Sequence, residues 1–335
     1  MLDLTQAPYN ITQPYTSNDD SSAPDYGPAI MQANDDLANG NWGRMDTGGA
    51  DGGRMILPPF TVSTSIPIRL HDGVSIEGHS HASSRLTTRD NFPATGAGNH
   101  IIALGDIDLP RHASFGGQVK NMIVSAKKGL VAAPGNYCVF SDSLQDSGYI
   151  FDNCRIDGGT HFGAVKYVHG IGGASIVKMR DLEVISRKDA LALGNLPMVI
   201  DVSGSTMVTL EEIEPTCGWV DDANQGLGAV PGSFGIAVYN GDVEIYGVHA
   251  EGVQFPIWFG DGGSHNNGYN RAHVERITGG AGNLCLVRVD GSTKWKDQIT
   301  LKNIMKKTPS IPNSLSSNQP GVPSRTADIS DQIRV

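Results

Sequence analysis

Apolar and polar residues alternate in a short pattern that recurs seven times along the chain. Each copy reads apolar, any, apolar, any, turn, apolar, any, apolar, and the copies lie at 117–125, 149–157, 177–185, 208–216, 243–251, 272–280 and 299–307. The third positions of successive copies are 27 to 35 residues apart. Alternation with period two is typical of β-strands, because successive side chains point to opposite faces. We therefore expect a short strand in each copy.

Two positions of the pattern define its geometry. The sixth position is apolar in every copy, as Met122, Cys154, Leu182, Ile213, Val248, Ile277 and Ile304. The fifth position favours residues that tolerate a left-handed backbone and so predicts a sharp corner, at Asn121, Asn153, Asp181, Gly247 and Asn303. Glu212 and Arg276 occupy the same position without this preference, so we expect a looser corner in those two copies.

A second family of short strands lies between the copies. It comprises 100–106, 137–143, 198–204, 235–241, 255–261 and 284–291, most of which end in a Gly, Asp or Ser turn. A strand of this length cannot bury its own apolar face, but stacking each repeat on the one before it forms a continuous inward column. The sequence therefore predicts an all-β fold, a parallel β-helix of about eight coils. Helical heptads do not fit the glycine and β-branched content, and a β-sandwich does not repeat one motif every thirty residues.

The coil motif and the segment before it resemble the pectin-lyase-like right-handed parallel β-helix superfamily, which includes pectate lyases, polygalacturonases and many phage tailspikes. Members commonly begin with a short helix, a Gly-Gly stretch and a strand that ends in Leu-Pro. Here an apolar helix face at Ala29, Ile30, Ala33 and Leu37 precedes GGRMILPPFTV at 52–62, although Pro59 stands where the family usually has glycine. The resemblance implies an N-terminal segment with a capping helix at 1–45 and a β-helix at 46–308. Residues 309–335 are rich in Pro and Ser and have no periodicity, so we expect an extended arm there.

Composition narrows the classes of function. The net charge is −10, which argues against a duplex nucleic-acid binder, since such proteins need a basic face. No apolar run approaches the ~20 residues of a membrane span, and the first residues do not have the pattern of a secretion signal. The four cysteines lack metal-site spacing, so we expect small buried hydrophobes and predict no metal or other cofactor.

Outward positions of stacked coils line up in files, and the fourth position is the most informative. Lys120, Asp152 and Arg180 alternate in charge, as in a ladder of ion pairs. The later coils gather carboxylates, and because glycoside hydrolysis needs two of these groups, the candidate catalytic residues are Glu211, Glu244 and Glu275. Glu214 and His249 are expected on the same side. The motifs of the family's lyases and polygalacturonases are absent, so solvated strand surface is the competing interpretation.

Aromatic and histidine side chains supply the candidate binding residues, because sugar faces stack on rings. They are Tyr246, His249, His273, Trp258 and Tyr239. Trp258 is expected to be exposed if its neighbours Phe255, Ile257 and Phe259 point inward.

Three functions remain open at this point. The first is a tailspike-like virion protein, a homotrimer assembled in the host cytoplasm that binds or coats a polysaccharide and contacts other virion proteins through its termini. The second is a polysaccharide depolymerase, a hydrolase or lyase. The third is a secreted or cell-surface β-helix without enzymatic activity. The fold alone does not choose among them, because it supports unrelated activities.

Overall fold

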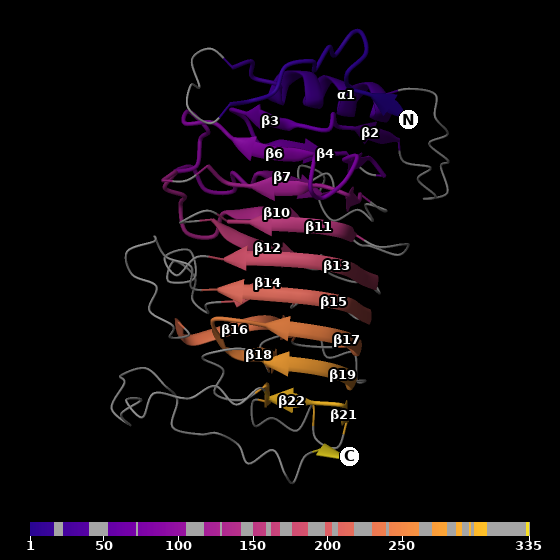
Figure 1. Ribbon diagram of the computed structural model, residues 1–335, viewed down its shortest axis with the longest axis vertical. Helices are drawn as coiled ribbons and strands as arrows, with labels where there is room; N and C mark the ends of the chain where they lie inside the picture. Colours follow the sequence, from indigo (N-terminus) through magenta and orange to yellow (C-terminus); the bar gives the residue numbers. More distant parts are fainter. Residues whose placement is uncertain are drawn as a thin grey trace.

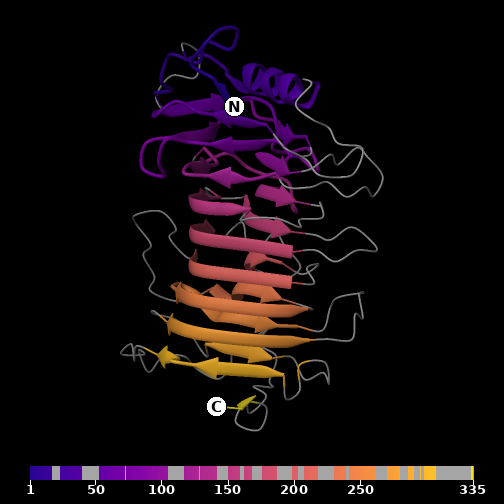
Figure 2. The same cartoon turned by 90° about the vertical axis from the view of Figure 1, so that its right-hand side faces the viewer.

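The computed structural model describes residues 1–16, 23–39, 53–71, 73–104, 117–127, 129–141, 150–158, 162–167, 176–186, 198–202, 207–217, 230–238, 241–260, 270–279, 286–289, 295, 298–306 and 333–334. These residues form one helix and two long sheets, of 15 and eight strands, in which neighbouring strands run parallel. In Figures 1 and 2 the strands stack one above another along the long axis of the molecule. This is the arrangement of a parallel β-helix.

The first sheet carries the predicted coil motif. Its main path is β1 (Leu2–Asp3), β2 (Arg54–Ile56), β5 (Ser75–Glu77), β8 (Val119–Lys120), β11 (Phe151–Asp157), β13 (Ile176–Ser186), β15 (Met207–Cys217), β17 (Asp242–Ala250), β19 (Arg271–Gly279), β21 (Ile299–Lys302) and β23 (Ile333–Arg334). Four further strands pair beside this path, β3 (Thr61–Thr64), β6 (Arg85–Thr88), β9 (Ile123–Ser125) and β22 (Met305–Lys306).

The second sheet contains the second predicted strand family. Its strands are β4 (Ile68–Leu70), β7 (Ile102–Leu104), β10 (Tyr137–Ser141), β12 (Gly163–Tyr167), β14 (Met198–Asp201), β16 (Val230–Val238), β18 (Val253–Phe259) and β20 (Val287–Val289). Strand β12 was not predicted from the sequence. The strands of this sheet lie in chain order, so each coil adds one strand to each sheet through this part of the molecule.

The predicted inward column is confirmed by the strand register. Leu182 pairs with Cys154 on one side and Ile213 on the other, and the file continues through Val248 to Ile277. All five side chains are at most 3% exposed. Apolar side chains stacked in register are removed from water on every coil, at roughly 25 cal/mol per Å² of apolar surface, and this burial is the main stabilising contribution to the fold.

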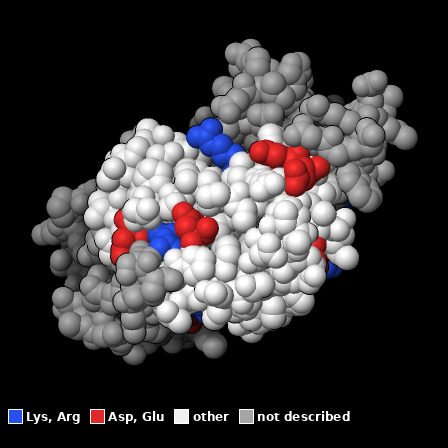
Figure 3. All heavy atoms as spheres, turned by 90° about the horizontal axis from the view of Figure 1, so that it is seen from above, with Lys and Arg blue, Asp and Glu red and all other residues white. Residues whose placement is uncertain are grey.

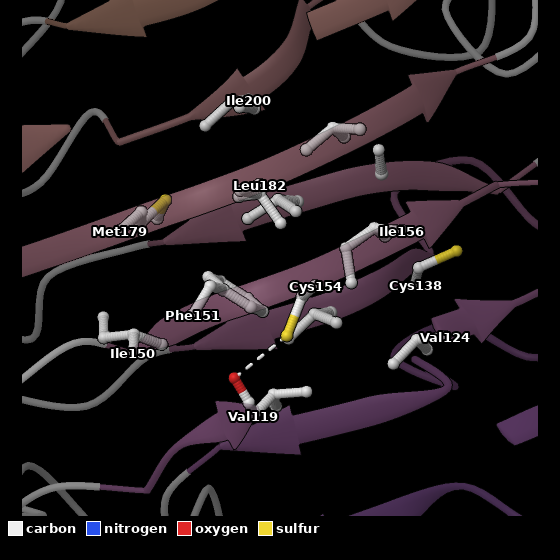
Figure 4. Close-up of a cluster of buried hydrophobic side chains, with 14 of the residues drawn as sticks. Val119, Val124, Cys138, Ile150, Phe151, Cys154, Ile156, Met179, Leu182 and Ile200 are labelled. Carbon is white, nitrogen blue, oxygen red and sulfur yellow. Dashed lines mark hydrogen bonds between the residues drawn. The ribbon is translucent and has the colours of Figure 1, made fainter. Parts of the chain in front are cut away.

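The core lies between the two sheets and is apolar throughout the cluster in Figure 4, where Phe151, Leu182 and Ile200 converge. Cys138, Cys154 and Cys217 are buried, as predicted, while Cys285 lies outside the described residues. The Cys154 thiol donates to the Val119 carbonyl over 3.2 Å, and burial raises the pKa of Cys154 to about 12. Burial therefore favours the neutral thiol of Cys154, which packs as a small hydrophobic group.

The corners of the first sheet are uniform, which corrects one expectation. All seven fifth-position residues have left-handed backbone, with φ of 51° at Glu212 and 59° at Arg276 against 51° at Asn121 and 75° at Gly247. The corner is therefore no looser at Glu212 and Arg276. The stacked strands on both sides set the backbone conformation, and this tertiary constraint overrides the local preference of the residue.

A side-chain bridge explains how Glu212 and Arg276 fit this corner. Their side chains form an ion pair although the residues lie two coils apart. Gly247 is the corner residue of the coil between them, and a Cβ there would lie 2.5 Å from the Glu212 Oε2 atom. Because Gly247 has no side chain, the space through which the Glu212 carboxylate reaches Arg276 stays open.

The outermost strands of the first sheet come from the two ends of the chain. Strand β1 pairs with β2 at one end, and β23 pairs with β21 at the other. Helix α1 (Gly27–Asn39) packs at the β1 end beside β2, β3 and β4, with Ile30, Ala33 and Leu37 buried. Viewed onto this end, most of the described surface is uncharged (Figure 3). Among the described residues, no helix has the length and apolar character needed to cross a membrane.

Candidate functional site on the first sheet

The predicted outward file is present in register on the first sheet. Lys120, Asp152, Arg180, Glu211, Tyr246, Glu275 and Lys302 are successive cross-strand neighbours. In the earlier coils, Arg180 donates to both carboxylate oxygens of Asp152 over 2.9 Å. This pair is one step of the ion ladder that the alternating charges predicted.

In the later coils, acidic and aromatic side chains lie together on this surface. We call them the Glu–Tyr face, which consists of Glu211, Glu244, Tyr246, His273 and Glu275. Glu244 and Tyr246 both project from β17, and their register partners on β19 are His273 and Glu275. The His273 Nε2 atom lies 3.5 Å from Glu275 Oε2, and the rings of Tyr246 and His273 have centroids 5.7 Å apart. The β-strand alternation thus brings the three candidate carboxylates around one aromatic ring.

Three carboxylates act on the phenol of Tyr246. Partial burial raises the pKa of Tyr246, and the carboxylates of Glu244, Glu275 and Glu211 raise it further. The phenol therefore stays protonated at neutral pH and can donate a hydrogen bond, while the carboxylates accept. An aromatic face surrounded by acceptors is suited to a neutral polyhydroxylated ligand, and it repels an anionic one.

His249 and Glu214 do not join this group. Both lie beyond the left-handed corner, on the following stretch of their strands, where His249 bonds to Thr278 over 2.9 Å and to Glu251 over 3.2 Å. Glu214 is the register neighbour of Glu183, which pairs with Arg155 over 3.4 Å. The corner therefore divides the carboxylates and histidines expected on one side into two separate groups.

Trp258 is buried, contrary to the expectation of an exposed ring. It does point away from Ile257 and Phe259, which lie in the main core, but it is only 5% exposed. Its ring stacks on Phe234 with centroids 4.4 Å apart. Trp258 therefore belongs to a separate aromatic cluster, while Tyr239, the remaining predicted binding residue, lies outside the described residues.

The pKa of Glu214 provides a test of the electrostatic interactions among the side chains beyond the corner. Burial and the neighbouring Glu183 carboxylate raise the pKa of Glu214, and His249 only partly offsets them. The folded state then binds this proton more tightly than the unfolded state, so stability falls as the pH rises from the ordinary glutamate pKa of ~4.3. We expect Glu214→Gln to increase the free energy of unfolding at neutral pH by about 0.2–1 kcal/mol, because it removes a like-charge cross-strand pair.

Urea titrations of both proteins at neutral pH and at a pH of about 3.5 check this expectation. The gain should disappear at the lower pH, where Glu214 is protonated in both states. Glu183→Gln is the matched control, because it relieves the same repulsion but loses the ion pair with Arg155. An equal gain in the control would contradict the assignment.

Within the described parts of the chain, no group of three or more His, Cys, Asp or Glu side chains has a geometry that could hold a metal ion. A scan against protein-family models gave no match, and a search of curated proteins gave none. The resemblance of the coil motif to the pectin-lyase-like superfamily accordingly stays a prediction.

Proposed function

We propose that this chain is a virion structural protein of the tailspike type, a homotrimer whose Glu–Tyr face binds a glycan surface. In this proposal the β-helix is right-handed, has about eight coils and belongs to the pectin-lyase-like superfamily. The right hand follows the general rule for parallel strands joined by crossover connections. The termini contact other virion proteins.

The observation that carries the proposal is the position of Tyr246 between Glu211 and Glu275 on three consecutive coils. The three side chains are parts of regular strands, so the backbone hydrogen bonds of the sheet hold their spacing at ~4.8 Å per coil. Such a surface is preorganised, which reduces the entropy lost on binding an extended chain of sugars. The aromatic ring supplies stacking, and the carboxylates orient the sugar hydroxyl groups.

A glycan array with the purified chain tests the binding. We expect the wild type to bind neutral glycans and Tyr246→Ala to weaken that binding about ten- to thirtyfold, as removal of an aromatic anchor does. Lys120→Ala is the control, because Lys120 lies in the same file four coils away. Equal binding by wild type and Tyr246→Ala would overturn the assignment of this face.

Light scattering tests the assembly independently of binding. We expect a mass of three chains, and a monomer at micromolar concentration would contradict the virion-type proposal. It would instead favour the secreted or cell-surface alternative.

The spacing of the carboxylates supports a second candidate, a polysaccharide depolymerase. Glu211 and Glu275 lie two coils apart, which corresponds to ~9–10 Å between their backbones. This is near the ~6.5–9.5 Å that separates the general acid and general base of inverting glycoside hydrolases. Glu244 and His273 lie beside the pair and could orient the attacking water.

A reducing-end assay on a panel of bacterial surface polysaccharides separates hydrolysis from binding. If the second candidate holds, Glu211→Gln and Glu275→Gln each lower the rate of release by about 10²–10⁴-fold, while binding in the glycan array persists. Release that is unchanged in both variants would exclude the carboxylates as catalytic groups.

A further inference from the structure

The outer face of the second sheet carries its own file of chemically active side chains. Arg69, Ala103, Phe140, Lys166 and Asp201 are successive cross-strand neighbours on β4, β7, β10, β12 and β14. Their strand neighbours on either side, such as Ile102, Val139, Val165 and Ile200, are buried in the core between the sheets. The file therefore faces away from the core, on a different side of the molecule from the Glu–Tyr face.

Three aromatic rings, those of His100, Tyr137 and Phe140, lie together at this file. His100 stacks on Phe140 with centroids 4.2 Å apart and an interplanar angle of 5°, and Tyr137 lies 6.0 Å from His100 and 6.4 Å from Phe140. The Tyr137 ring lies over Gly163, where a Cβ would come within 2.6 Å of the ring. Phe140 and Tyr137 are partly exposed. The rings thus form a fixed platform that a glycine on the next coil accommodates.

His100 presents a hydrogen-bond donor at this platform. It is 6% exposed, and its Nδ1 atom accepts the Tyr137 backbone N–H over 3.1 Å. Burial, with the charges of Arg69 and Lys166, lowers the pKa of His100 to about 4. The ring is therefore neutral at pH 7, and its one proton is on Nε2.

Lys166 places a positive charge beside this platform, next to Asp201 and Tyr137. Its Nζ atom lies 3.4 Å from Asp201 Oδ2 and 5.6 Å from the centroid of Tyr137. Burial disfavours the charged ammonium, but Asp201 and Tyr137 outweigh this effect, and the pKa of Lys166 is raised. The Lys166 side chain remains 30% exposed, whereas that of Asp201 is 4% exposed. The Lys166 side chain therefore keeps access to solvent, and the two charged groups that lower the pKa of His100, Arg69 and Lys166, are cations.

From this geometry we infer a second saccharide-binding site, in which the Lys166 ammonium and the His100 Nε2–H hold the carboxylate or sulfate of an acidic saccharide while its ring packs on Phe140 and Tyr137. The carboxylate and the sulfate share the property that the site recognises, an anionic oxygen group beside a sugar ring. The site complements the Glu–Tyr face, whose carboxylates repel such a ligand. It deepens the proposed glycan-binding function and rests on it for its biological context.

Isothermal titration with three probes tests the inference: a hexuronate oligosaccharide, a sulfated dextran oligosaccharide and a neutral dextran oligosaccharide. We expect at least one acidic probe to bind more tightly than the neutral one. His100→Phe keeps the stacked ring but removes both the Nε2 donor and the acceptor of the Tyr137 N–H. It must therefore also give the wild-type circular dichroism spectrum, and it should weaken acidic binding several-fold. Lys166→Met should weaken it at least tenfold, the scale of a lost charge-assisted contact.

Two controls keep the result decisive. Lys166→Met leaves Asp201 without this cation, so the double variant with Asp201→Asn is measured beside it, and both must give the wild-type circular dichroism spectrum. Lys178→Met removes the same charge from β13 of the first sheet and should leave binding unchanged. Equal losses in Lys178→Met and Lys166→Met, or no preference for either acidic probe, would overturn the site. Tyr246→Ala should retain acidic binding, so failure of the Glu–Tyr face is distinguishable from failure of this site.

Discussion

Gly252→Ala is expected to lower the free energy of unfolding by about 2–5 kcal/mol, because it combines backbone strain with a steric overlap between coils. Gly252 has a left-handed φ of 66° between β17 and β18. A Cβ at this position would overlap the carbonyl group of Cys217 on the preceding coil. That carbonyl belongs to backbone held by a hydrogen bond from Cys217 N–H to the Glu251 carbonyl, 2.9 Å long, so it cannot move away at low cost.

Two variants separate the steric overlap from the backbone conformation. Gly98 also has a left-handed φ, 74°, but a Cβ there would meet nothing within 4 Å, so Gly98→Ala should cost only the ~1–2 kcal/mol of the left-handed conformation. Gly252→Asn tolerates that conformation yet still introduces a Cβ, and it should be nearly as damaging as Gly252→Ala. Urea unfolding followed by circular dichroism measures all three. Similar costs for Gly252→Ala and Gly98→Ala would refute the close approach of the coils.

Phe151→Ala should destabilise the protein by about 3–5 kcal/mol, the usual cost of removing a buried aromatic side chain. Phe151 is 1% exposed and lies in register between Val119 and Met179, so neighbouring coils cannot close the cavity without breaking their own pairing. Asp152→Ala, one residue along the same strand, removes only a surface ion pair and should cost ~0–1 kcal/mol. Denaturant titrations of the two variants therefore test the alternation directly, and equal costs would contradict the assigned strand orientation.

The stacking of coils could be predicted because it depends on a local pattern that repeats. An apolar sixth position in every copy is enough to align Leu182 with Ile213, and the strand register follows. The outward file through Glu211, Tyr246 and Glu275 is then a consequence of alternation. The outward file of the first sheet was thus accessible from the sequence, whereas the separation of Glu214 and His249 from the candidate carboxylates was not.

Features that depend on side-chain contacts between different coils could not be predicted from the sequence. Trp258 points outward as alternation requires, but its burial depends on Phe234, which precedes it by 24 residues. The site around Lys166 depends on the register of β10, β12 and β14, and β12 was missed because GAVKY is short and follows a glycine-containing stretch. In each case the deciding partner belongs to another coil, at a separation that variable loops conceal.

The bridge between Glu212 and Arg276 across Gly247 has a consequence for sequence variation among homologues. Three positions on three coils are mechanically linked, although no two of them are adjacent in the chain. A side chain acquired at position 247 would block the path of the Glu212 carboxylate, so it should be inherited together with a shorter or uncharged residue at 212 and the loss of the arginine at 276. Covariation of these three columns would be a recognisable signature of this coil in distant descendants of the same ancestor.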